Sequence, residues 1–162
     1  MRKIFVLALI TILSINLFAQ SSDDSNFRLG IGAAYVSEVE STSLSIKGIY
    51  EITEKWEAAL AYSHVFENLG LSWDIIDLDG HFVFYNNDKK ISAYALTGFA
   101  LNFWKRETLL TNETRTGSYM GMNIGAGMNI GIGEHFNLAP EIRGTIFDLS
   151  YTRIGITFQY MF

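Results

Sequence analysis

Residues 152–162 read Thr-Arg-Ile-Gly-Ile-Thr-Phe-Gln-Tyr-Met-Phe. Apolar or aromatic side chains occupy every second position of this stretch: Ile154, Ile156, Phe158, Tyr160 and Phe162. Alternation with a period of two is typical of a β-strand with one apolar face. A tilted transmembrane strand needs about ten residues, which this stretch supplies. We therefore expect a membrane-spanning strand whose apolar face contacts lipid.

The start of the sequence indicates export from the cytoplasm. Arg2 and Lys3 precede an almost unbroken apolar run over residues 4–18, which ends at Ala19 before a polar stretch. This arrangement predicts a cleavable signal peptide over residues 1–19. The alternative, a transmembrane helix, needs about 20 apolar residues. We expect a short periplasmic segment over residues 20–25 and one barrel domain over residues 26–162.

Composition limits the class of protein further. With Arg2 and Lys3 removed, 10 of the 12 basic residues remain against 17 acidic ones, a net charge of −7. An acidic chain is a poor partner for nucleic acid, and we expect none. The sequence has no cysteine, so it has neither disulfides nor thiolate metal ligands.

The same alternation recurs in seven earlier stretches, and no convincing amphipathic helix separates them. We expect strands at residues 26–36, 43–52, 56–66, 72–84, 91–104, 119–132 and 136–147. Short connections make consecutive strands antiparallel. Links at 53–55, 86–90 and 133–135 are short, and we expect those at 37–42, 67–71, 105–118 and 148–151 to be longer or more variable. This predicts an all-β, eight-stranded antiparallel up-and-down transmembrane barrel with both termini at the periplasmic side.

The side chains on the two faces of these strands separate a membrane barrel from a soluble one. A soluble, lipocalin-like barrel turns its apolar face inward. Here the face opposite the large apolar side chains carries small residues and charges, which suit a narrow lumen. We expect an ion-pair network in the lumen, formed by Arg28, Lys47, Glu51, Glu57, Asp77, Asp79, His81, Glu141, Arg143 and Arg153.

With its signal peptide, Gly-rich alternating strands and aromatic end, the sequence resembles small bacterial outer-membrane barrels of the OmpX/OmpA/opacity-protein type. In that resemblance Phe158, Tyr160 and Phe162 correspond to the signal that the outer-membrane assembly machinery reads. The resemblance implies location in the bacterial outer membrane, with outer-membrane lipids and the assembly machinery as partners. It does not imply one activity, because such barrels serve many functions.

Neither catalysis nor a cofactor is expected. His64, His81 and His135 each lack the His-x-Ser pairing that one family of lipid-modifying barrels carries, and no metal site is predicted. The expected lumen holds five acidic residues against four basic ones, not counting His81, which favours paired charges that fill the interior. We expect a structural or surface-interaction role, with an unidentified surface ligand bound through loop 105–118. A small channel for ions or small solutes is the alternative.

Overall fold

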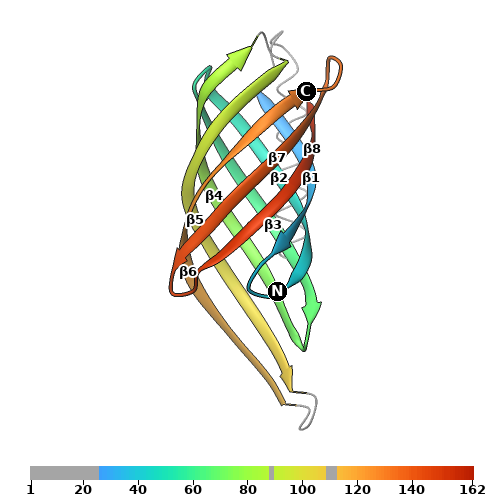
Figure 1. The fold of residues 1–162 in the computed structure, drawn as a ribbon, viewed down its shortest axis with the longest axis vertical. Helices are drawn as coiled ribbons and strands as arrows, with labels where there is room; N and C mark the ends of the chain where they lie inside the picture. The colour runs from blue at the N-terminus through green and yellow to red at the C-terminus, as the bar shows by residue number, and fades with distance from the viewer. Residues whose placement is uncertain (1–25, 88–89, 109–112) are drawn as a thin grey trace, which may run out of the picture.

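The computed structural model describes residues 26–87, 90–108 and 113–162; the expected signal peptide and segment 20–25 lie outside this part of the chain. Its eight strands are β1 Phe27–Val36, β2 Ser41–Thr53, β3 Trp56–Asn68, β4 Leu71–Asn87, β5 Ile91–Thr108, β6 Glu113–Gly131, β7 Phe136–Phe147 and β8 Tyr151–Met161. Each strand pairs with the next, and β8 pairs with β1, so the sheet closes (Figure 1). The predicted eight-stranded antiparallel barrel is confirmed.

Closure depends on the pairing of the first and last strands. β1 and β8 run antiparallel from Arg28 opposite Met161 to Val36 opposite Arg153. The Phe162 amide adds a hydrogen bond to the Phe27 carbonyl. Closure pairs the backbone N–H and C=O groups at the edges of β1 and β8 within the sheet. A strand in lipid needs such pairing, because lipid offers no hydrogen-bond partners. No helix in the described ranges is long and apolar enough to cross a membrane.

The outer surface of the barrel is apolar on every strand. Exposed large side chains include Ile31, Leu44, Leu60, Leu78, Phe99, Ile124, Ile142 and Ile154, one from each of the eight strands. An apolar surface that surrounds the whole molecule would be costly in water and is suited to lipid. Aromatic rings gather at the end that holds the turns before β3 and β7. Trp56 lies 5.0 Å from Phe82, and Tyr160 lies 4.9 Å from Phe162, between ring centroids.

The expectation of a longer link at residues 67–71 is wrong. β3 and β4 are joined by the two residues Leu69 and Gly70 alone. Both have positive φ angles, 50° and 77°, as in the tight turns that match the twist of a hairpin. Because the turn is so short, the two strands continue further than the alternation of apolar residues indicated.

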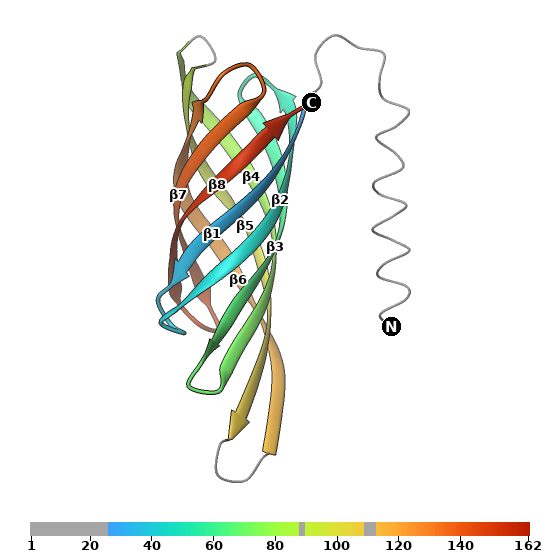
Figure 2. The same cartoon turned by 90° about the vertical axis from the view of Figure 1, so that its right-hand side faces the viewer.

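Segment 105–118 is not a loop either, so this expectation is also wrong. β5 continues to Thr108 and β6 begins at Glu113, with Lys105 opposite Thr116 and Arg106 opposite Arg115. Figure 2 shows this two-stranded ribbon extending beyond the rest of the barrel. Backbone pairing does not require apolar side chains. A ribbon exposed to water on both faces has no alternation of apolar and polar residues from which its strands could be predicted. Residues 109–112, between β5 and β6 in the sequence, lie outside the described part.

Candidate functional site: the barrel interior

The barrel interior holds the ten residues that the sequence assigned to the lumen. Eight of them are buried: Arg28, Lys47, Glu57, Asp77, Asp79, His81, Arg143 and Arg153. The Glu141 side chain is 10% exposed. Nine of the ten form ion pairs or hydrogen bonds with one another. Glu51 lies opposite Glu57 on the same face of the sheet but has no ion-pair partner among the described residues.

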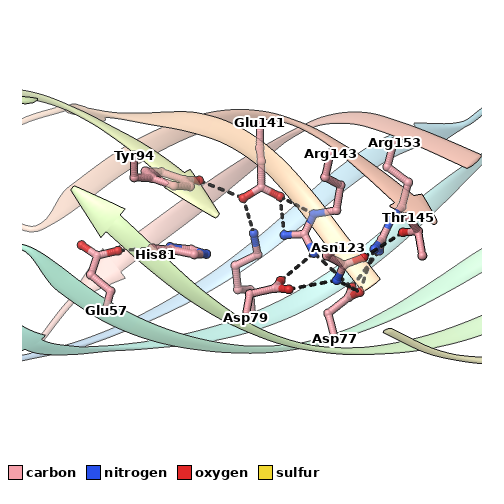
Figure 3. Close-up of polar contacts among 11 residues, drawn as sticks. Glu57, Asp77, Asp79, His81, Tyr94, Asn123, Glu141, Arg143, Thr145 and Arg153 are labelled. Carbon is pink, nitrogen blue, oxygen red and sulfur yellow. Dashed lines mark hydrogen bonds and ion pairs between the residues drawn. The ribbon is translucent and has the colours of Figure 1, made fainter. Parts of the chain in front are cut away.

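Glu141 and Arg143, two residues apart on β7, form the centre of this network (Figure 3). One Glu141 oxygen, Oε2, accepts hydrogen bonds from Lys47 Nζ at 2.9 Å and from Tyr94 Oη at 2.8 Å. The other, Oε1, accepts from Arg143 Nε at 2.8 Å. Arg143 Nη1 reaches across the lumen to Asp79 Oδ2 at 2.7 Å. The group therefore ties β2, β4, β5 and β7 together.

A second group lies beside the first, toward the ribbon end. Arg153 donates from both terminal nitrogens to the two oxygens of Asp77, each at 2.7 Å. Such a two-point pairing is among the strongest and most directional ion pairs in proteins. The amide of Asn123 joins the two groups, because it donates to Asp77 at 2.8 Å and to Asp79 at 2.9 Å. The polar network is therefore continuous along the middle of the barrel.

A third group fills the interior nearer the end that holds the termini. Glu57 pairs with Arg28 through one oxygen and with His81 Nδ1, at 3.2 Å, through the other. The His81 ring stacks on Tyr94, with centroids 4.4 Å apart and planes 9° from parallel. Tyr94 thereby connects this group to Glu141 in the centre. Among the described residues, each of the four Arg and Lys side chains buried in the interior has a carboxylate partner.

An apolar group that was not predicted from the sequence lies inside the opposite end of the barrel, where the ribbon of β5 and β6 begins. Trp73 is 2% exposed, and its ring lies 5.2 Å from Tyr151 and 5.8 Å from Tyr119, between centroids. Val36, Val65 and Ile75 are buried in the same cluster. The sequence could have predicted their inward position. Trp73 and Ile75 precede Asp77 by four and two positions, so strand alternation places all three on one face.

A small cavity lies among these groups. A lumen cavity of about 40 Å³ lies between the small side chains of β1, β2, β3 and β8 and the charged groups Lys47, Asp77, Glu141, Arg143 and Arg153. One water molecule needs roughly 10–15 Å³ of such space, so the cavity can hold a few water molecules.

The remaining histidines do not form a catalytic arrangement. Ser63 is buried in the lumen, whereas the His64 side chain is 47% exposed on the outer face. His135 lies in the turn before β7, where its ring is 5.9 Å from Tyr160. Within the described residues, no three His, Asp or Glu side chains are placed to hold a metal ion.

A closed eight-stranded barrel with an apolar outer surface and paired charges on its inner face has the fold of the small outer-membrane β-barrels. Solved structures that share this fold include the following three, at sequence identities that show the fold alone. The N-terminal barrel domain of Pseudomonas aeruginosa OprF has a TM-score of 0.72 and 16% identity, covering 86% of this chain and 100% of that one. Neisserial surface protein A has a TM-score of 0.72 and 13% identity, covering 87% of this chain and 100% of that one. Ail of Yersinia pestis has a TM-score of 0.61 and 15% identity, covering 85% of this chain and 97% of that one. No protein-family model and no curated protein matches the sequence.

Proposed function

We propose that this chain is an integral barrel of the bacterial outer membrane that serves a structural or surface-interaction role, without catalytic activity. The observation that supports the proposal is the combination of an apolar exterior on all strands with buried ion pairs in the interior, which we infer to fill it. The exterior requires lipid, and outer-membrane lipids are therefore its first partner. The filled interior argues against the alternative of a small channel, since solutes would have to displace ion pairs.

In this proposal, the ribbon of β5 and β6 is the part of the chain that faces the cell exterior. Its charged side chains are exposed: Lys105, Arg106, Glu107, Glu113 and Arg115. The Lys105 ammonium donates to Glu107, and this hydrogen bond raises the pKa of Lys105. Among the similar structures, Ail is known in complex with the heparin analogue sucrose octasulfate. For this chain, we propose that the ribbon contacts a surface ligand, in place of the loop that the sequence indicated.

An arginine placed at two depths on the outer surface of the barrel tests whether that surface faces lipid. Ile156, in the middle of β8, is 45% exposed on the outer surface. Ile156→Arg should lower the free energy of unfolding by about 2–4 kcal/mol, because arginine is costly at the midplane of a bilayer. The measurement is a urea titration of the protein refolded into lipid vesicles.

Ile52→Arg is the matched control. Ile52 is 60% exposed but lies next to the turn at residues 54–55, at the edge of the apolar surface. The cost there should be about 0–1 kcal/mol. Equal costs at the two positions, or a wild type that stays monomeric and folded in buffer without lipid or detergent, would contradict the membrane assignment.

A further inference from the structure

One carboxylate on the inner face of the barrel is left without a cation. The Glu51 side chain has neither an ion pair nor a hydrogen bond within the described part of the chain, and it lies directly opposite Glu57. Like charges in that position repel. Glu57 already engages Arg28 and His81, and Lys55, in the turn after β2, is exposed and forms no ion pair with a described residue. A further positive charge beside Glu51 would therefore be stabilising.

Glu51 lies at the end of the barrel where the chain enters its first strand. Its backbone amide donates to the carbonyl of Asn26 at 2.8 Å, and Asn26 immediately precedes β1. Glu51 is two residues from the end of β2 and is partly exposed, whereas eight of the other lumen residues are buried. A group carried by the residues before Asn26 can therefore reach the Glu51 carboxylate from outside the barrel.

The expected removal of the signal peptide creates a cation next to this site. Cleavage after Ala19 makes Gln20 the first residue, with an α-ammonium group that the uncleaved chain does not have at this position. Residues 20–25 read Gln-Ser-Ser-Asp-Asp-Ser and contain no Lys or Arg. Six residues span at most about 20 Å when extended, so the ammonium stays within reach of Glu51. A short tether also gives it a high effective concentration there.

We propose that the α-ammonium of the mature chain pairs with Glu51 and supplies the fifth cation of the lumen network. Five acidic side chains then face five positive charges, which are the ammonium, Arg28, Lys47, Arg143 and Arg153, with His81 neutral. The ammonium donates charge-assisted hydrogen bonds to the carboxylate. Because the amine at residue 20 forms only on cleavage, the network is completed only in the processed chain. This pairing depends on the export and outer-membrane location proposed above.

The test is zero-length cross-linking of the mature chain, refolded in detergent micelles. A water-soluble carbodiimide activates a carboxylate, and an amine in contact with it then forms an amide, with the net loss of one water taken up by the carbodiimide as a urea. Peptide mass spectrometry should find the amine of Gln20 joined to Glu51 about fivefold more often than to the exposed Glu54. Gln20→Ala, whose amine cannot be lost by cyclisation of the glutamine, should cross-link at least as well.

Matched variants identify the carboxylate. Glu51→Gln should remove the main cross-link of the N-terminal amine, whereas Glu54→Gln, in the turn after β2, should leave it unchanged. Equal joining to the two carboxylates in the folded protein would overturn the proposal, as would joining of Glu51 to Lys55 instead. Heat-dependent migration on a gel reports folding in each case. A folded barrel without the cross-link contradicts the ammonium pairing alone, whereas failure to enter any micelle or bilayer contradicts the proposed function as well.

Discussion

Asp77→Ala should lower the free energy of unfolding by about 3–5 kcal/mol, the usual cost of leaving a buried charge without its partner. Asp77 is 1% exposed and accepts both terminal nitrogens of Arg153. Arg153 has no other ion-pair partner in the described structure, whereas Arg143 keeps Asp79 and Glu141. The measurement is a urea titration of the refolded barrel in vesicles.

Asp74→Ala is the matched control for this substitution. Asp74 is on the same strand, three positions away, but faces outward and is half exposed. Its loss should cost about 0–1 kcal/mol, as for exposed ion pairs. Adding Arg153→Met to Asp77→Ala should restore most of the stability, because it removes the unpaired cation. Equal costs at the two aspartates, or no recovery in the double variant, would show that water screens the interior charges.

Replacing Phe158, Tyr160 and Phe162 together by alanine should strongly reduce the amount of protein in the outer membrane while leaving export intact. We propose that these side chains are read by the assembly machinery, as the resemblance to outer-membrane barrels implies. All three are exposed on the outer surface, at 43%, 39% and 57%, and are available to a partner before lipid covers them. The measurement is cell fractionation, with the unassembled protein expected in the periplasm.

Closure of the barrel must be separated from recognition, because β8 also pairs with β1 and β7. The alanine variant keeps the backbone hydrogen bonds that close the sheet, such as the Phe162 amide to the Phe27 carbonyl. It should therefore still refold into vesicles without the machinery, with the loss limited to side-chain burial in lipid. Ile31, Leu44 and Leu60 replaced together by alanine provide a control of similar apolar loss elsewhere on the outer surface. Normal outer-membrane levels of the aromatic variant would refute the assembly role.

The fold could be read from the sequence because each lipid-facing strand alternates in the same way. β7 was predicted over its full length, and the inward positions of Arg28, Asp77 and Arg153 follow from a period of two. The ends of β3–β6 were missed where the strands leave the apolar surface. There, alternation stops although backbone pairing continues, and the two-residue turn at Leu69 and Gly70 lacks an Asn-Gly or Asp-Gly signal.

The partners inside the lumen could be predicted less well, because they depend on shear and on side-chain reach across the barrel. The sequence indicated which residues line the lumen but not which of them pair. In the structure, Glu141 is the ion-pair partner of both Lys47 and Arg143, and Arg143 also pairs with Asp79. The link through Asn123 between Asp77 and Asp79 joins β6 to β4, which are not neighbours in the sheet. No periodicity in the sequence encodes such a contact.

The central claim is that paired charges close the lumen, and its most direct test is the conductance of the refolded wild type in a planar lipid bilayer. Each interior cation is held by a carboxylate, and Trp73 with its aromatic neighbours fills the ribbon end. An eight-stranded barrel has an interior that side chains can fill. We predict that insertion produces no steady current above the bare bilayer. A large, steady conductance, together with a negligible stability cost for Asp77→Ala, would contradict the closed lumen and support the small channel.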